Sequence, residues 1–267
     1  MKSYAAVLAL FLLVTFTSTA IAQKTDHPKD GKTDSSKDVK TDAPKDAKAE
    51  MSVIPAPPPI TDKSTPMELA KAALAAMGGD NFKKLKSSFV TGSANLYAPN
   101  QAGSIPGKFG IATAGEKVRV DVDAQPIIVF KQIYDGERSF STIPGIEIPP
   151  PSKFGLPLLG KIDQPGYAVS AIPDKKKLRG FRITNPEGNT TDYYIDPVTA
   201  RVSEYLIPWQ GYTFGSSITK FAEVDGVLVP MAFSQRFEMP QGAYFAEYKV
   251  KSVKLNGPIA NDVFVIQ

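Results

Sequence analysis

The chain has 267 residues, of which 42% are hydrophobic and 22% charged, with a formal net charge of +4. It contains no cysteine, which excludes disulfide bonds and thiol chemistry, and its basic residues form no domain-wide patch of the kind that binds nucleic acid. The 20 glycines and 23 prolines favour many turns and therefore β structure.

The first 22 residues predict a secretory signal peptide. Lys2 supplies a basic start, residues 5–16 form an apolar run, and Ala20-Ile21-Ala22 offers a small-residue cleavage site. The apolar run is shorter than the ~20 residues that span a bilayer, and no other stretch is long enough. We therefore expect cleavage near Ala22 and a periplasmic or secreted mature chain without a transmembrane segment.

Residues 23–64 predict a disordered tether. An eight-residue Lys/Thr/Asp repeat starts at Lys24, Lys32 and Lys40, and between residues 24 and 50 seven lysines balance seven acidic residues. Such a segment has almost nothing apolar to bury. Several prolines after Met51 stiffen its end towards polyproline II.

The folded domain is expected to span residues 65–267 and to begin with a helix. Thr65-Pro66-Met67-Glu68 predicts a capping box with proline at the first helical position, and Gly78-Gly79 predicts the helix end. Met67, Leu74 and Met77 lie along one apolar stripe, which indicates that the helix covers a sheet.

The rest of the chain predicts strand after strand, separated by turn residues. The expected strands lie near residues 88–97, 108–114, 117–123, 127–134, 138–143, 167–172, 178–184, 190–195, 201–207, 213–222, 227–238 and 243–255. About 11–12 antiparallel strands cannot stay flat, so the sheet is expected to curl. The predicted fold is mainly β with an N-terminal helix (α+β), an unclosed half-barrel capped by the helix and an apolar loop.

The clearest hairpin turns at Asp225-Gly226, a pair that favours a type I′ turn. Alternation predicts an inner face that is apolar and faces the N-terminal helix, formed by Val227, Val229, Met231, Phe233 and Phe237. The outer face is expected to carry Leu228, Pro230, Ser234, Arg236 and Glu238. After a second loop at residues 239–242, Tyr244 and Tyr248 share a face of the last strand.

An apolar, proline-rich segment at residues 143–160 interrupts the strand pattern. A loop of this length inside a compact domain is either functional or part of core closure, and both interpretations stay open. As a mobile lid over a cavity, it would use Ile146, Ile148, Phe154, Leu156, Leu158 and Leu159.

Catalytic signatures are absent from the sequence. The one histidine, His27, lies in the repeat, and no nucleophile elbow, zinc-binding helix or phosphate-binding loop occurs. Asp121 and Asp123 share one face of a strand, which favours a solvated face over a metal pair, and Asp196 starts a turn. We therefore expect no metal, no cofactor and no enzymatic activity, with a carboxylate-based hydrolase as a minor alternative.

Three segments support a family resemblance: A-L-A-A-M-G-G-D-N-F-K-K-L-K (73–86), D-Y-Y-I-D-P-V-T-A-R-V (192–202) and V-K-L-N-G-P-I-A-N-D-V-F (253–264). Together with E-V-D-G-V-L-V-P (223–230), they resemble the periplasmic outer-membrane lipoprotein carrier (LolA/LolB-like) superfamily. The resemblance implies an unclosed antiparallel barrel, with helices over its mouth, that holds acyl chains.

Two hypotheses of different classes follow. In the first, a monomeric carrier binds a lipid or a lipidated partner in a hydrophobic concavity, and we expect this concavity to be lined by Met67, Leu74, Met77, Phe130, Phe140, Val229, Met231, Phe233, Phe237, Tyr244 and Tyr248. Further large apolar residues support a surplus over one closed core: Tyr205, Trp209, Tyr212 and Phe214. In the second, a module with a filled core binds an envelope protein by edge-strand pairing. An apolar cavity favours the first and a filled interior the second.

Overall fold

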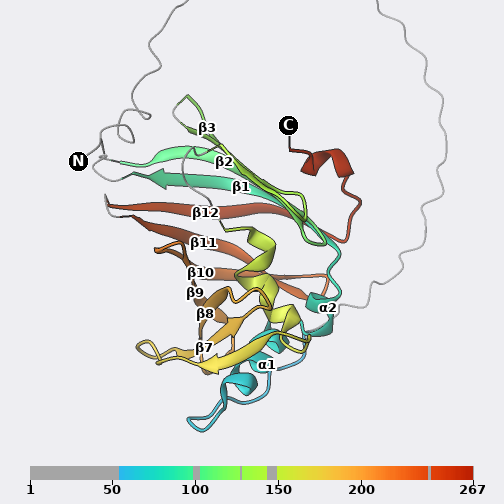
Figure 1. The fold of residues 1–267 in the computed structure, drawn as a ribbon, viewed down its shortest axis with the longest axis vertical. Helices are drawn as coiled ribbons and strands as arrows, with labels where there is room; N and C mark the ends of the chain where they lie inside the picture. The colour runs from blue at the N-terminus through green and yellow to red at the C-terminus, as the bar shows by residue number, and fades with distance from the viewer. Residues whose placement is uncertain (1–53, 99–102, 127, 143–148, 240–241, 267) are drawn as a thin grey trace, which may run out of the picture. The chain divides into compact units, whose positions relative to one another are not determined.

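The computed structural model describes residues 54–98, 103–126, 128–142, 149–239 and 242–266 (Figure 1). All of them belong to the second of two units into which the chain divides, Ala49–Gln267. The predicted signal peptide and the Lys/Thr/Asp repeat lie outside the described residues. Within the described part, Ile54 and Ile60 pack against the main core, so residues that we assigned to the tether belong to the folded unit.

Two helices open the unit, α1 (Pro66–Ala76) and α2 (Asp80–Lys83). Five strands follow: β1 (Ser87–Tyr97), β2 (Ile105–Ala114), β3 (Lys117–Ala124), β4 (Ile128–Tyr134) and β5 (Ser139–Ser141). Two 3-10 helices come next, η3 (Pro151–Lys153) and η4 (Leu156–Lys161). The remaining strands are β6 (Ala168–Ala171), β7 (Arg179–Thr184), β8 (Thr190–Ile195), β9 (Val202–Trp209), β10 (Tyr212–Val224), β11 (Val227–Met239) and β12 (Gly242–Leu255), followed by η5 (Asn261–Phe264).

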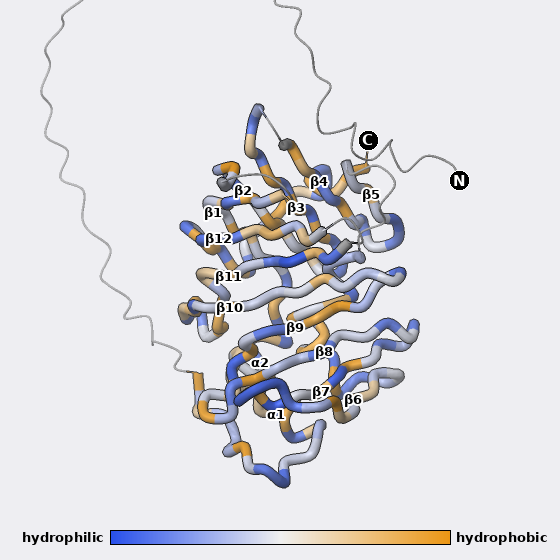
Figure 2. Tube along the Cα trace, turned by 90° about the vertical axis from the view of Figure 1, so that its left-hand side faces the viewer, coloured by the Kyte–Doolittle hydropathy of each residue, from blue (hydrophilic) through white to orange (hydrophobic). Residues whose placement is uncertain are grey.

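All twelve strands form one antiparallel, unclosed sheet, which confirms the predicted half-barrel class. Their order is β5-β4-β3-β2-β1-β12-β11-β10-β9-β8-β7-β6, and Figure 2 shows the strands stacked in this order. Two meanders are therefore joined where the first strand pairs with the last. The sequence predicted one continuous meander and did not foresee this junction.

The order of the strands places β5 and β6 at opposite edges of the sheet. The chain between them must cross from one edge to the other, and it does so over one face, as the η3–η4 region in Figure 1 shows. We call residues 149–167 the crossover segment. The face that it covers is the inner face, and the opposite one is the outer face.

Local signals at the helix and the hairpin are confirmed. Thr65 caps α1, its hydroxyl accepts from Glu68 N, and the Glu68 carboxylate accepts from Thr65 N at 2.7 Å. Asp225 and Gly226 have φ angles of 49° and 70°, as a type I′ turn requires. The helix end and this turn are joined, because Leu228 N donates to Met77 O at 3.0 Å.

The register defines which side chains share the inner face. One row of directly opposed residues runs across eight strands: Phe181, Tyr193, Tyr205, Ser216, Gln235, Ala246, Leu96 and Ile105. At the β7–β9 end this face is closed by α1 and η4. The main core there is a filled cluster made of Leu69, Ala70, Ala73, Leu74, Met77, Leu158, Leu159, Ile162, Phe181, Ile183, Tyr193, Ile195, Val202 and Leu228.

Two predictions about β11 were wrong. Leu228 was assigned to the wet face, yet it is 6% exposed and belongs to the main core. The pairing with β10 is irregular between Ile218 and Phe221, so strict alternation does not extend along the whole strand. The second wrong prediction is that Phe233 faces the N-terminal helix. The helix α1 lies against β6, β7 and η4, and Phe233 packs in a separate cluster.

The junction of α1 and the β10–β11 hairpin should tolerate no side chain at Gly78. Its φ is +117°, and a Cβ would lie 2.4 Å from Gly226 O. We expect Gly78→Ala to lower the free energy of unfolding by about 3 kcal/mol, from backbone strain plus this clash. Gly79→Ala is the matched control, because Gly79, with φ 55° and ψ −117°, also strains an alanine but has open space around its Cβ; it should cost less, about 1–2 kcal/mol, since only the clash is absent. Urea denaturation measures both, and equal losses would contradict the assignment.

Candidate functional site

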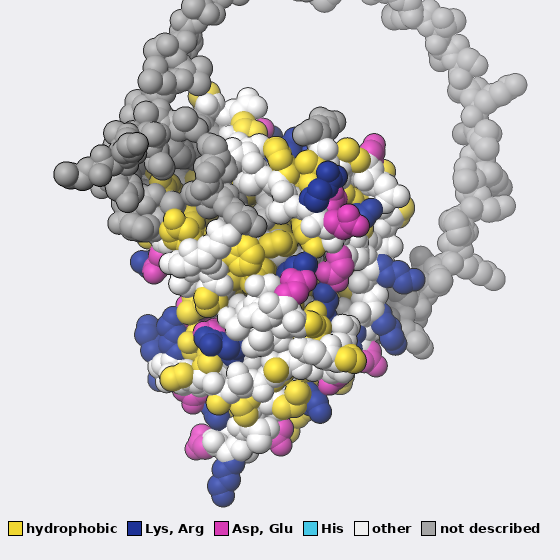
Figure 3. All heavy atoms as spheres, in the orientation of Figure 1, with side chains coloured by type: hydrophobic (Ala, Val, Ile, Leu, Met, Phe, Trp, Pro, Cys, Tyr) yellow, Lys and Arg dark blue, Asp and Glu magenta, His cyan; other side chains and the backbone are white. Residues whose placement is uncertain are grey.

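A second apolar cluster occupies the inner face of β1–β4, β11 and β12, and we call it the open surface. Its buried centre is formed by Ala94, Phe109 and Val122. Around them lie half-buried side chains that remain partly accessible: Val90, Leu96, Ile111, Val120, Phe130, Phe233, Tyr248 and Val250. Figure 3, which views the side carrying the crossover segment, shows hydrophobic side chains gathered above that segment.

Three aromatic rings organise the open surface. The Phe233 and Tyr248 rings stack with centroids 4.8 Å apart, and Phe109 meets both edge-on, at 6.2 and 5.1 Å. The register explains this packing, because small residues of β1 lie directly opposite two of the aromatic residues. Ala94 is opposite Tyr248, and Gly92, opposite Phe109, has room for no Cβ since the Phe109 ring would lie 2.6 Å from it.

The pKa of the Tyr248 phenol shows that its hydroxyl is shielded from water. Burial raises the pKa of Tyr248 to about 12, and the nearby Tyr205 phenol raises it further. An ionised group is therefore disfavoured at the centre of the open surface. The surface suits an uncharged, apolar guest.

A second aromatic row continues from the open surface towards the β10–β12 ends. The Phe214 and Phe237 rings stack at 4.3 Å, and Tyr212 meets Phe237 at 5.6 Å. Tyr244 lies directly opposite Phe237. These side chains are half-buried, so the apolar inner face extends beyond the triad.

The crossover segment is hydrogen-bonded to both halves of the sheet. On β4, the buried Gln132 side chain donates to Pro149 O at 3.0 Å. On β8, Gly155 N donates to the Thr191 hydroxyl at 3.2 Å, and the Tyr193 hydroxyl donates to Gly155 O at 2.5 Å. Backbone groups that would otherwise be buried without partners are thus paired. The described part of the segment is a fixed bridge.

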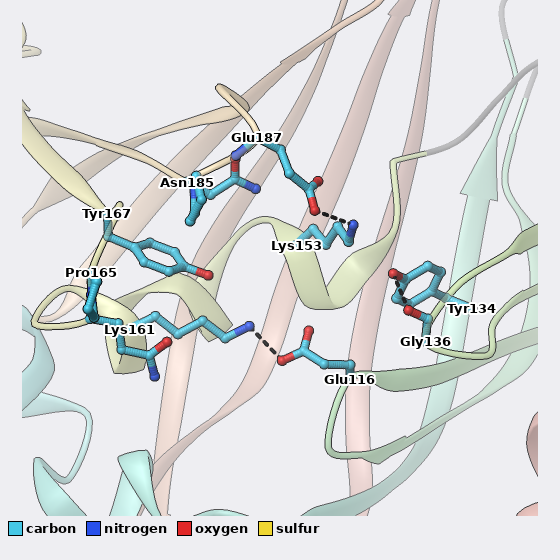
Figure 4. A pocket seen from close by; sticks show the side chains of 11 residues that line it. Glu116, Tyr134, Gly136, Lys153, Lys161, Pro165, Tyr167, Asn185 and Glu187 are labelled. Carbon is cyan, nitrogen blue, oxygen red and sulfur yellow. Dashed lines mark hydrogen bonds and ion pairs between the residues drawn. The ribbon is translucent and has the colours of Figure 1, made fainter.

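A pocket of about 430 Å³ lies beside this bridge, and Figure 4 shows two ion pairs in its wall. Lys153 Nζ lies 2.6 Å from Glu187 Oε1, and Lys161 Nζ lies 2.7 Å from Glu116 Oε1. Tyr134 and Tyr167 complete the wall with other polar residues. The pocket is polar, and so it is not the apolar cavity that the carrier hypothesis anticipated; the apolar area is the open surface instead.

The predicted site residues fall into separate places. The main core holds Leu74, Met77, Leu158 and Leu159 as buried residues, with Leu156 packed against it and Met67 half-buried on α1. Phe154 is also buried, and its ring meets Trp209 edge-on. The open surface holds Phe130, Phe233 and Tyr248, and the adjoining row holds Phe237 and Tyr244. Val229 is buried, and Met231 lies half-buried at the pairing irregularity.

Three predicted residues lie elsewhere. Phe140 is opposite Ile133, on the other face of β4 from Phe130, and therefore on the outer face. Ile146 and Ile148 lie outside the described residues. The lid itself stays a prediction, because two of its six residues lie outside the described part of the chain.

The residues that the prediction missed lie on β1, β2 and β3. Phe109, Val122 and Ala94 form the centre of the open surface, yet they were noted only as parts of strands. The alternation of these strands was visible in the sequence, but not their position next to β12. The pairing of β1 with β12 brings the two sets together.

Neither a metal site nor a membrane-spanning helix emerges from the described ranges. No group of three or more His, Asp or Glu side chains within them is arranged to hold a metal ion. No described helix is long and apolar enough to cross a membrane. The pocket carboxylates of Glu116 and Glu187 come from different turns, and each is paired with a lysine.

The chain has the fold of the LolA superfamily. It matches the crystal structure of a LolA superfamily protein from Nitrosomonas europaea with a TM-score of 0.50 at 12% identity, over 76% of this chain and 98% of that one. A DUF1329 family protein from Desulfovibrio piger gives 0.48 at 10% identity (76% and 98%). A putative outer membrane lipoprotein-sorting protein domain from Vibrio parahaemolyticus gives 0.44 at 10% identity (74% and 95%). No family model and no curated protein matches the sequence.

The anchoring of the crossover segment to β8 should depend on the Thr191 hydroxyl. Thr191→Val keeps the shape of the side chain but leaves Gly155 N–H buried without its acceptor, which costs about 1–3 kcal/mol of unfolding free energy. Thr190→Val, on the neighbouring residue of the opposite face, should change it by less than about 0.5 kcal/mol. Chemical denaturation of both variants checks the difference, and a neutral Thr191→Val would show that the bond does not anchor the segment.

The free energy of unfolding at alkaline pH should depend on the ionisation of the Tyr248 phenol. Its folded pKa, about 12, lies above the unfolded value of ~10, so its contribution is complete below pH ~10 and is lost as the pH rises towards 12. We expect Tyr248→Phe to lose less unfolding free energy than the parent between about pH 9 and 11. Some loss should remain, since burial raises the pKa of Tyr193 and Tyr205 too. Identical pH profiles would contradict the burial of this phenol.

Proposed function

We propose that the protein is a non-catalytic periplasmic carrier that binds acyl chains, of a lipid or of a lipidated partner, on the open surface. The observation that carries this proposal is an apolar cluster on the inner face whose rim is half-buried, beside a main core that is already closed. The fold shared with a LolA superfamily protein is consistent with it.

The open surface offers the physical properties that an acyl chain requires. Aromatic and aliphatic side chains are available together, and each methylene that leaves water contributes ~0.8 kcal/mol. A chain of several methylenes therefore gains a substantial free energy without any polar contact. Aromatic faces such as those of Phe233 and Tyr248 provide rigid walls at little entropic cost.

The alternative, a protein-interaction module with a filled core, is supported by the β7–β9 end of the sheet. There, α1 and η4 fill the inner face, and Tyr193 and Phe181 stack at 5.0 Å. A filled end and an open end are compatible in one domain. The half-buried rim of the open surface favours the carrier function over the module.

The proposal predicts binding of a fluorescent fatty acid by the purified mature chain, with a blue shift of its emission. The double variant Ile111→Gln, Val250→Gln places two amides on the open surface and should weaken binding about 10- to 100-fold, because two apolar contacts of ~0.7–1.4 kcal/mol each are lost. Equilibrium titration gives the affinities, and mass spectrometry of organic extracts identifies co-purifying lipid.

The matched control is Glu247→Gln, Ser252→Gln, which also adds two amides to exposed positions. Both residues lie on the outer face of β12, Glu247 opposite Asn95 and Ser252 opposite Thr91. The control should bind the probe like the parent. The absence of both co-purifying lipid and a blue shift would refute the carrier function and leave the interaction module.

A further inference from the structure

The outer face of the central strands carries a band of lysines, which we call the lysine band. The register aligns Lys108 on β2, Lys249 on β12 and Lys220 on β10 in one row, through Ser93 on β1 and Ala232 on β11. Lys254 lies further along β12, opposite Phe89, and Lys251 lies at the bulge between them. All five lysines are exposed.

None of these five ammonium groups has a protein partner in the described part of the chain. The ion pairs found there use other basic residues, such as Lys83, Lys153, Lys161 and Lys175. Two acids lie near the lysine band: Asp123 is opposite Lys108 in the register, and Glu247 precedes Lys249 by two residues and accepts from the Tyr97 hydroxyl. The band therefore keeps an excess of positive charge.

The lysine band and its two nearby acids together carry as much net charge as the whole domain. From Met51 to Gln267 the sequence has 23 basic and 20 acidic residues, a net charge of +3. The five lysines with Asp123 and Glu247 carry +3, so the rest of that range is neutral on balance. Neighbouring lysines of the row are two strands apart, about 10 Å. This separation is close to the Debye length at physiological salt, so they repel one another little while facing the same partner.

Large apolar side chains are exposed on the same side. Phe89 is 44% exposed and pairs with Lys254, and Val129 is 59% exposed and continues the row beyond Asp123. Val265, 54% exposed, follows η5, which is tied to the outer face where Arg119 Nη1 donates to Val263 O at 3.1 Å. Apolar groups beside unpaired lysines are typical of proteins that lie on a membrane surface.

We propose that the outer face docks the protein onto an anionic lipid surface through the lysine band and Phe89. Spread, unpaired lysines match a plane of anionic headgroups, and each lysine contributes about a fivefold gain in partition. Protein interfaces, in contrast, are depleted of lysine, which argues against an acidic protein as the occupant. The docking face is opposite the open surface, so a docked molecule keeps its inner face accessible.

Vesicle flotation of the mature chain tests this proposal. The protein should float with vesicles of phosphatidylcholine that contain phosphatidylglycerol, should not float with phosphatidylcholine alone, and should be released by high salt. Neutralising three members of the band, Lys108→Gln, Lys249→Gln and Lys254→Gln, should weaken partition roughly 100-fold. Phe89→Ser should weaken it further at any salt concentration.

The control variant neutralises three exposed lysines far from the band, Lys63→Gln, Lys71→Gln and Lys177→Gln, and should float like the parent. An equal loss in this control, or equal flotation with neutral vesicles, would overturn the proposal. Binding to polyglutamate without flotation would assign the band to an acidic protein instead. The fluorescent fatty acid titration separates this proposal from the carrier function, because the three-lysine variant should bind that probe unchanged.

Discussion

The pairing of β1 with β12 is the interaction on which the rest of the structure depends. It joins strands from opposite ends of the domain at the middle of the sheet and leaves β5 and β6 at its two edges. The connection between those edges then has no short route, and it crosses the inner face. The covered end, the bridge and the open surface all follow from that one register.

The two ends of the inner face differ in the side chains they present. At the β7–β9 end, hydroxyl and backbone groups pair inside a filled core, as Tyr193, Thr191 and Gly155 do. On β1–β3 and β12, the same face carries a mainly apolar cluster, in which Tyr248 packs against the buried Phe109. Specific polar bonds hold the bridge, whereas the remaining apolar area stays available to a guest that needs no particular bond.

Much of this architecture could be predicted from the sequence because its signals are local. Turn residues and alternation located the strands, with β8 predicted at its observed bounds, and the Thr65 cap located α1. Strand partners are not encoded locally, so the junction of β1 and β12 was missed, and with it the role of Phe109. Leu228 was misplaced because a pairing irregularity, which leaves no mark in the sequence, shifts the alternation.

The short edge strands of the sheet limit aggregation by strand addition. An unclosed sheet leaves unpaired backbone groups along both margins, which is a route to aggregation. Here the margins are β5, with three residues, and β6, with four. A neighbouring chain that added a strand to either would gain only a few ladder bonds, too few to offset the entropy lost on association. The barrel can therefore stay open without seeding fibres.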